Sequence, residues 1–166
     1  MIKLPEVISE EDLHKILKET KSIKHKLAFM LGFYECMRVS EIVALMPENI
    51  DFGARLIMIK QAKGSKDRNI PIAPEVMKGL KHLPIGIGIR ALQYAFKQQC
   101  IKVLGREALH FHSLRASGIT YYLTKKRWSS LEVQRMAGHS KIQTTQIYTN
   151  INPNDLVNRM WEKDEN

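Results

Sequence analysis

The sequence is poor in cysteine and has no long apolar run. Its only cysteines among 166 residues are Cys36 and Cys100, too few for a disulfide framework and without the clustered His/Cys spacing of a zinc site. The longest apolar stretch, Leu27 to Phe33, is far too short to cross a bilayer, and the N-terminus carries acidic residues where a signal peptide needs an apolar run. We therefore expect a soluble cytoplasmic protein with both thiols reduced, and no membrane partner.

Aromatic and acidic residues are also scarce, and these shortages favour particular partners. Aromatics make up 7% of the chain, which lacks the aromatic sheet signature of RNA-recognition domains, so base stacking is not its evident strategy. Against 26 Lys and Arg there are only 17 Asp and Glu, which leaves a net charge of +9. Such a surface gains free energy by releasing counterions from phosphate backbones. A nucleic acid is therefore favoured over an anionic membrane surface, although charge does not choose between DNA and RNA.

The apolar periodicity predicts one mainly helical domain over residues 1–166. Hydrophobic residues make up 44% of the chain, enough for one continuous core, and no repeat, low-complexity segment or linker divides it. Ser9 with Asp12, and Ser129 with Glu132, form capping boxes, and Ser40 is expected to cap a short helix, "EIVAL". Helices are expected at about 10–20, 24–34, 74–81, 89–104, 112–125, 129–138 and 142–149, with a final amphipathic helix from 153.

A β-hairpin interrupts this helical pattern. "RLIMIKQA" and "RNIPI" are β-branched or apolar segments, and the turn-rich "KGSKD" joins them with Gly64 at the bend. The predicted fold class is therefore mainly α with one small antiparallel β-sheet (α+β).

Six polar residues fit one reaction, phosphoryl transfer to a hydroxyl without a metal ion. Guanidinium groups match the charge that develops on the nonbridging oxygens of a phosphodiester under attack. A histidine can assist the attacking hydroxyl in losing its proton, and a lysine can protonate the departing alkoxide. Each residue has an ordinary explanation when taken alone, so only the combination is informative. The six are Arg38, Lys63, His112, Arg115, His139 and Tyr148.

Four segments, in order, resemble the boxes of the tyrosine recombinase, or phage integrase, family. They cover nearly the whole chain and end with an interval of nine residues between His139 and Tyr148. Each box alone would be a weak signal, but the ordered set is a strong one. The segments are "MRVSEIVAL", "KGSKDRNIPI", "HSLRASGITYYL" and "MAGHSKIQTTQIYTN".

The resemblance implies a role for each matched residue. Arg38 would be the first catalytic arginine, with Glu41 as a supporting acidic residue, and Lys63 the catalytic lysine of the hairpin. Lys66 and Arg68 flank Lys63 and could each claim its role, but we interpret them as DNA phosphate contacts near the site.

The remaining boxes supply the other reacting groups. They give His112 and Arg115 as the H-x-x-R pair, His139 as the second histidine and Tyr148 as the nucleophile. The domain would resemble a tyrosine recombinase catalytic domain. Tyr148 would cleave double-stranded DNA through a 3′-phosphotyrosyl intermediate, and a 5′-hydroxyl would rejoin the strand, without metal, ATP or organic cofactor. The active protein would be a homo-oligomer, a tetramer, on paired DNA sites, and would associate with the nucleoid when bound to DNA.

The sequence departs from the family pattern at its start and at two positions within it. Cys36 stands where the family commonly has glycine, and Ala116 where it commonly has a second histidine. The opening "LPEVISEED" resembles the junction after the usual upstream DNA-clamping domain, which we expect to be absent, as in an excised fragment or a short natural member. Residues 152–166 would form a C-terminal helix, for which the resemblance slightly favours packing on a neighbouring protomer over packing on its own core.

Three other functions remain open from the sequence. A eukaryotic-type type I topoisomerase shares the chemistry but relaxes supercoils without exchanging partners. A pure DNA-binding module would keep the basic surface without the reaction, and the complete set of six residues argues against it. A metal-dependent phosphodiesterase would need clustered carboxylates, and the acidic residues show no ligand-like spacing in the sequence.

Overall fold

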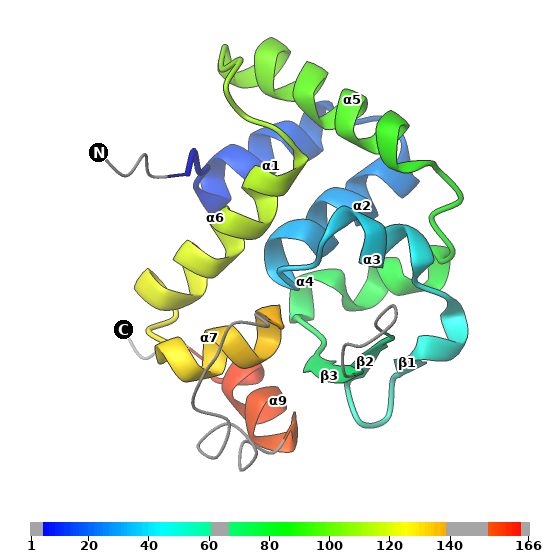
Figure 1. Ribbon diagram of the computed structural model, residues 1–166, viewed down its shortest axis with the longest axis vertical. Coiled ribbons are helices and arrows are strands. Elements are labelled where there is room, and N and C mark those ends of the chain that lie inside the picture. The colour runs from blue at the N-terminus through cyan, green and yellow to red at the C-terminus, as the bar shows by residue number, and fades with distance from the viewer. Residues whose placement is uncertain (1–4, 61–66, 139–152, 164–166) are drawn as a thin grey trace.

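The computed structural model describes residues 5–60, 67–138 and 153–163, and within them the chain is mainly helical with one small sheet (Figure 1). This confirms the predicted fold class. Short helical turns η1 (Pro47–Asn49), η2 (Lys78–His82) and η3 (Cys100–Leu104) follow α3, α4 and α5. The helices are α1 (Glu10–Glu19), α2 (Ile23–Tyr34), α3 (Val39–Ala44), α4 (Pro74–Met77), α5 (Ile89–Gln99), α6 (Phe111–Thr124), α7 (Ser130–Ala137) and α9 (Pro153–Trp161).

The helix starts test the capping predictions. The Ser9 hydroxyl accepts the Asp12 amide, and the Ser129 hydroxyl accepts the Glu132 amide, so both predicted caps are confirmed. The prediction for Ser40 is wrong, because α3 begins at Val39 and Ser40 lies within its first turn. Arg38 occupies the cap position, and its backbone N–H donates to the Glu41 carboxylate.

Helix ends differ from the predictions at two places. The helix expected over 74–81 is α-helical only to Met77 and continues as the tighter turn η2, while η3 ends the helix expected over 89–104 as a wider π-turn. Gly105 ends this segment as predicted, with a φ of +64°, a left-handed conformation that glycine adopts at little cost. The helix predicted over 142–149 lies outside the described residues.

The close crossing of α2 and α6 is the centre of the core. Most of α2 is buried, including Phe29, Phe33 and Tyr34. At Gly118 of α6, an added Cβ would lie 1.9 Å from the carbonyl oxygen of Phe33, so only glycine lets the two backbones approach this closely. The crossing brings the end of α2 beside the first half of α6, where two of the predicted site residues lie.

Three antiparallel strands, in the order β1-β2-β3, form the sheet: β1 (Ile50–Asp51), β2 (Leu56–Ile59) and β3 (Arg68–Pro71). In the β2–β3 ladder, Ile59 lies opposite Arg68, which confirms the two strands of the predicted hairpin. The turn of the hairpin lies outside the described residues. Strand β1 was not predicted, because two residues carry no periodicity. Buried isoleucines attach the sheet to the helical core, at positions 57, 59 and 70.

Helix α9 packs on its own chain, beside β3. Leu156 and Met160 are buried in the common core, and the hydroxyl of Tyr122 donates a hydrogen bond to Met160 Sδ at 3.2 Å. The indole of Trp161 donates to the carbonyl of Ile72 at 3.0 Å. Two placements of the C-terminal helix were considered from the sequence, and in this single chain α9 packs on its own core. Exchange with a neighbouring protomer stays a prediction.

No helix among the described residues is both long enough and apolar enough to span a membrane.

Candidate active site

Arg38 lies where the chain turns from α2 into α3. Its backbone N–H donates to Glu41 Oε1 at 2.8 Å, which fixes the first turn of α3, and its Nη1 lies 3.7 Å from Glu41 Oε2. The Arg38 side chain remains 38% exposed. The turn has a φ of +52° at Cys36, in the left-handed region that favours glycine. Arg38 is thus held by its backbone while its guanidinium faces outward.

Arg115 lies on α6 and reaches the same turn. Its Nη1 donates to the carbonyl oxygen of Cys36 at 2.6 Å, and the residue is only 3% exposed. Burial, and then repulsion from Arg38, lower the pKa of the Arg115 guanidinium to about 10. The group therefore stays charged at neutral pH, in surroundings that disfavour its charge. An anion bound between Arg38 and Arg115 would remove that cost.

His112 lies one helical turn before Arg115 and is exposed. Partial desolvation, then the charges of Arg115, His110 and Arg38, lower the pKa of His112 below its usual value. The imidazole is therefore neutral at neutral pH and able to accept a proton. The ring of His110 stacks on it, with centroids 6.4 Å apart and planes 13° apart.

Glu41 and Arg68 form a buried pair beneath Arg38. Arg68 Nη1 donates to Glu41 Oε2 at 2.7 Å, Arg68 Nη2 donates to Oε1 at 3.2 Å, and Arg68 Nε donates to the carbonyl of Met136 at 3.1 Å. This supports Glu41 as a residue that orients its neighbours. The Arg68 guanidinium is engaged by Glu41 and by the Met136 carbonyl, and its interpretation as a phosphate contact stays a prediction.

Four predicted site residues lie outside the described residues: Lys63, Lys66, His139 and Tyr148. Their neighbours in the sequence are nevertheless placed. Segment 61–66 joins the paired ends of β2 and β3, and Gly138, with a φ of +68°, ends α7 directly before His139. The structure therefore brings Arg38, His112 and Arg115 together, and the catalytic role of every predicted site residue stays a prediction.

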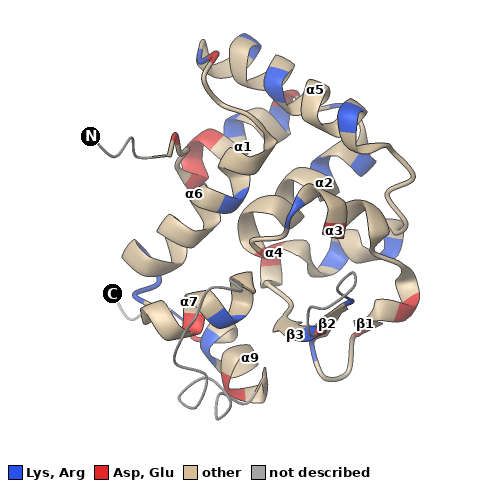
Figure 2. Cartoon of the chain, in the orientation of Figure 1, with Lys and Arg blue, Asp and Glu red and all other residues tan. Residues whose placement is uncertain are grey.

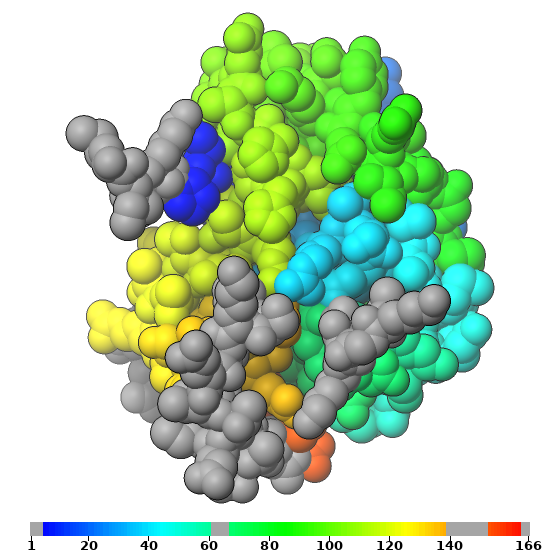
Figure 3. Space-filling view, in the orientation of Figure 1, coloured from blue at the N-terminus to red at the C-terminus, as the bar shows by residue number. Residues whose placement is uncertain are grey.

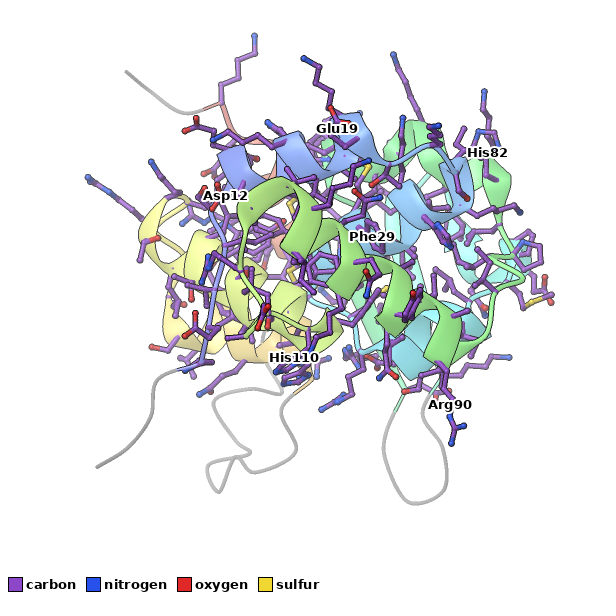
Figure 4. All side chains as sticks on the ribbon, turned by 90° about the horizontal axis from the view of Figure 1, so that it is seen from above. Asp12, Glu19, Phe29, His82, Arg90 and His110 are labelled. Atoms are coloured by element: carbon purple, nitrogen blue, oxygen red, sulfur yellow. The ribbon has the colours of Figure 1, made fainter. Side chains whose placement is uncertain are left out.

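The placed site residues share one face of the molecule. In Figure 3, α3 in cyan and α6 in yellow-green meet near the centre of that face. Beneath the surface, the hydrogen bond from Arg115 to the Cys36 carbonyl joins α6 to the turn before α3. Seen from above, His110 and Arg90 lie at one edge and Glu19 at the opposite edge (Figure 4). Figure 2 shows the acidic residues of the first turn of α1 in red, one after another, whereas Lys and Arg, in blue, are spread over many elements. The face that carries His110 is thus distinct from the acidic start of α1.

Two contributions to the site were missed from the sequence. One is His110, which precedes the H-x-x-R segment by two residues and would have been visible only as an extra histidine at the start of α6. The other is the Cys36 carbonyl that binds Arg115. Burial raises the pKa of the Cys36 thiol to about 12, so the thiol is protonated and inert. No sequence signal identifies a backbone carbonyl as a site component.

The arrangement can bind and activate a phosphate. It provides one exposed and one buried guanidinium, and a neutral imidazole, on one face. Within the described parts of the chain, no three His, Cys, Asp or Glu side chains gather closely enough to hold a metal ion.

Comparison with known proteins identifies the family. The family model for the phage integrase family matches residues 6–86 and 87–155. The chain belongs to the phage integrase family. Among its relatives is a tyrosine recombinase of Thermosipho africanus, 26% identical over 170 residues, which cover 90% of this chain and 58% of the relative. The chain thus spans little more than half the length of that recombinase.

Solved structures of other integrases and recombinases have the same fold. The integrase from mycobacterium phage Brujita superposes with a TM-score of 0.81 at 19% identity, over 96% of this chain and 58% of that one. XerH, a site-specific recombinase solved in a post-cleavage complex with palindromic difH substrate, gives a TM-score of 0.69 at 22% identity, over 89% of this chain and 50% of that one. At such identities, these likenesses establish the integrase catalytic-domain fold.

Proposed function

We propose that this phage integrase family member is the catalytic domain of a site-specific DNA recombinase, which breaks and rejoins strands through Tyr148. The observation that carries the proposal is the buried, charged guanidinium of Arg115, which lies beside Arg38 and His112 and has its pKa lowered by burial and by Arg38. A phosphodiester bound there would supply the missing anion. Membership of the family, and the DNA-bound state of XerH, support duplex DNA as the source of that phosphate.

In the first step, the phenolic oxygen of Tyr148 attacks the scissile phosphorus, and the bond from phosphorus to the 5′-oxygen breaks. His112, neutral at physiological pH, assists removal of the phenolic proton, and Lys63 protonates the departing 5′-oxygen. The product is a 3′-phosphotyrosyl bond and a free 5′-hydroxyl.

During this step, Arg38, Arg115 and His139 hold the nonbridging oxygens, where charge develops. In the second step, a 5′-hydroxyl from another strand attacks the phosphotyrosine and releases Tyr148. Because the phosphodiester energy is kept in the protein–DNA bond, the cycle consumes no ATP, and the proposed proton transfers require no metal.

Assembly follows from the same proposal. Strand exchange requires two duplexes and four cleavage events, so the working form is a homo-oligomer, a tetramer, on paired sites. If neighbouring protomers exchange α9, the contacts of Met160 and Trp161 with their own chain are released and made again with the neighbour. Exchange would then couple assembly to the segment that carries Tyr148, which directly precedes α9 in the sequence.

A nicked suicide substrate tests the proposal, because loss of the short 5′-end prevents religation. The wild-type chain should form a covalent protein–DNA adduct that survives denaturant, with a chelator present or absent, and Tyr148→Phe should form none. Adduct formed by the Phe variant would disprove the nucleophile assignment, and cleavage lost on chelation would support a metal-dependent phosphodiesterase. Plasmid relaxation without recombination of paired sites would instead indicate a topoisomerase.

A further inference from the structure

Arg68 contacts three separate parts of the site although its own side chain is buried. It is the first residue of β3, the strand that follows the segment containing Lys63. Its Nη1 and Nη2 donate to the two carboxylate oxygens of Glu41, in α3, and its Nε donates to the carbonyl of Met136, near the end of α7. One rigid planar group therefore joins β3, α3 and α7.

One of these partners, Glu41, binds a proposed catalytic residue, and the other, Met136, lies three residues before His139. The Glu41 carboxylate accepts the backbone N–H of Arg38 at 2.8 Å, so the orientation of the carboxylate sets the position of Arg38 and of the start of α3. The end of α7 leads directly into His139. A small movement of the Arg68 guanidinium would thus change the relative placement of Arg38, the start of β3 and the end of α7.

Gly138 is a second, independent sign that this junction is closely fitted. A Cβ at Gly138 would lie 2.7 Å from Cζ, Nε and Nη1 of Arg68, so the backbone at the end of α7 lies directly against the guanidinium. Its φ of +68° also favours glycine. The end of α7 is therefore held by Arg68 in two ways. The Nε of Arg68 donates to the Met136 carbonyl, and the Gly138 backbone lies against the guanidinium.

From this geometry we infer that Arg68 is a positioning residue, which fixes Arg38, the start of β3 and the end of α7 in one arrangement without touching DNA. The inference rests on the proposed function. It differs from a phosphate contact, which would direct the guanidinium to DNA rather than to Glu41 and Met136. It also differs from a support for folding alone, which would leave the chemistry of correctly folded molecules unchanged.

The test uses two variants that keep the junction free of an unpaired buried charge. Arg68→Lys keeps a cation beside Glu41, but an ammonium cannot bind the carboxylate and the Met136 carbonyl through one planar fork. Arg68→Met with Glu41→Met replaces the whole pair by apolar groups of similar size, a change that folded proteins often tolerate. Arg106→Lys is the matched control, because Arg106 also binds one carboxylate (Glu6, 2.7 Å) and one backbone carbonyl (Val7, 3.0 Å).

Single-turnover cleavage of the suicide substrate at saturating DNA separates the possible roles. The burst amplitude counts competent molecules, and the rate constant reports their chemistry. Both Arg68 variants should keep the amplitude and lose about 10- to 100-fold in rate constant, as expected when reacting groups are misplaced by a fraction of an ångström to 1 Å. DNA affinity and its salt slope should stay unchanged, and Arg106→Lys should match the wild type throughout.

Two results would overturn the inference. A wild-type rate constant with a reduced amplitude would make Arg68 a support for folding only. A salt slope reduced by about one, with an unchanged rate constant at saturation, would make it a phosphate contact.

Amide hydrogen exchange measured by NMR tests, independently of catalysis, whether Arg68 anchors the end of α7. The Gly138 amide, which donates to the Gln134 carbonyl at 2.9 Å, should exchange at least about 10-fold faster in both Arg68 variants. The Leu13 amide in α1 should be unaffected. An unchanged Gly138 amide would refute the inference. If the wild-type chain made no adduct, the proposed function would fail while this measurement still decided whether Arg68 holds the end of α7.

Discussion

Two buried arginines, in two regions of the site, are held by different kinds of partner. At the crossing of α2 and α6, Arg115 donates to a backbone carbonyl and is repelled by Arg38. At the junction of β3, α3 and α7, Arg68 is bound by the carboxylate of Glu41. The Arg68 charge is neutralised within the fold, whereas the Arg115 charge remains available for a ligand. Burial by itself therefore does not distinguish a supporting arginine from a reacting one; the partner does.

The same substitution at the two arginines should have opposite consequences, and this is the largest expected effect. Arg115→Met should lower the cleavage rate by about 10²–10³-fold, because it removes a donor to the transition state. It should leave the melting temperature equal or higher, because it removes a buried cation that burial and Arg38 disfavour.

Arg68→Met should instead lower the free energy of unfolding by about 3–5 kcal/mol, because it removes the 2.7 Å ion pair with the buried Glu41 carboxylate and leaves only the Arg38 guanidinium, 3.7 Å away, to offset that charge. Thermal unfolding and suicide-substrate kinetics on both variants measure the contrast. If Arg115→Met were the less stable variant, or if its DNA affinity fell in proportion to its rate, the comparison would be wrong.

Gly118→Ala should disrupt the crossing of α2 and α6, which positions Arg115. The added Cβ would lie 1.9 Å from the Phe33 carbonyl oxygen, so α6 must move away from α2. We expect a loss of at least about 1–3 kcal/mol in the free energy of unfolding, measured by urea denaturation. Gly53→Ala is the control, because a Cβ there meets only Asp51 Oδ1 at an ordinary 3.5 Å. Equal stability of the two variants would contradict a backbone contact between α2 and α6.

Glu35, directly before Cys36, is a buried acid that can be compared with the two buried arginines. It is fully buried, its Oε1 accepts the Ala73 N–H at 2.6 Å, and no hydrogen-bond partner of its Oε2 is found in the described chain. Burial raises the pKa of Glu35 well above its usual value, although the Ala73 N–H opposes the shift. An acid with a raised folded-state pKa stabilises fully below its unfolded pKa and loses that contribution as pH rises through the folded value.

Glu35→Gln should therefore gain stability relative to the wild type as pH rises above about 4.5. The difference should grow by at most about 1.4 kcal/mol per pH unit, until the folded-state pKa is passed. Urea denaturation of both proteins from pH 4 to 9 measures it. A constant difference across this range would show that Glu35 is not held protonated.

The smallest expected effect is a shift in the pH profile of cleavage. His112 acts as a base in its neutral form, so kcat/KM should fall on the acid side, with a midpoint below the ordinary histidine value of 6.5. His110→Ala removes one cause of the lowered pKa of His112 and should move the midpoint upward. His82→Ala, near the edge away from His110, should leave it unchanged. A downward shift with His110→Ala would contradict the electrostatic role given to His110.

Much of this protein is determined by its sequence alone. Apolar periodicity and the serines at positions 9 and 129 located the main helices, because these signals are local, and β-branched residues located β2 and β3 for the same reason. The ordered segments around Arg38, Lys63, Arg115 and Tyr148 were enough to indicate the family.

Tertiary structure alone decided which charge is free and which is engaged. Arg38, Arg68 and Arg115 are chemically equivalent in the sequence, and the pairing of Arg68 with Glu41 was not foreseen because the two residues are 27 positions apart. The contact of Arg115 with the Cys36 carbonyl spans 79 positions, and it exists only because Gly118 lets α6 approach α2. Pairing across such distances depends on how the helices pack, which no local pattern of residues records.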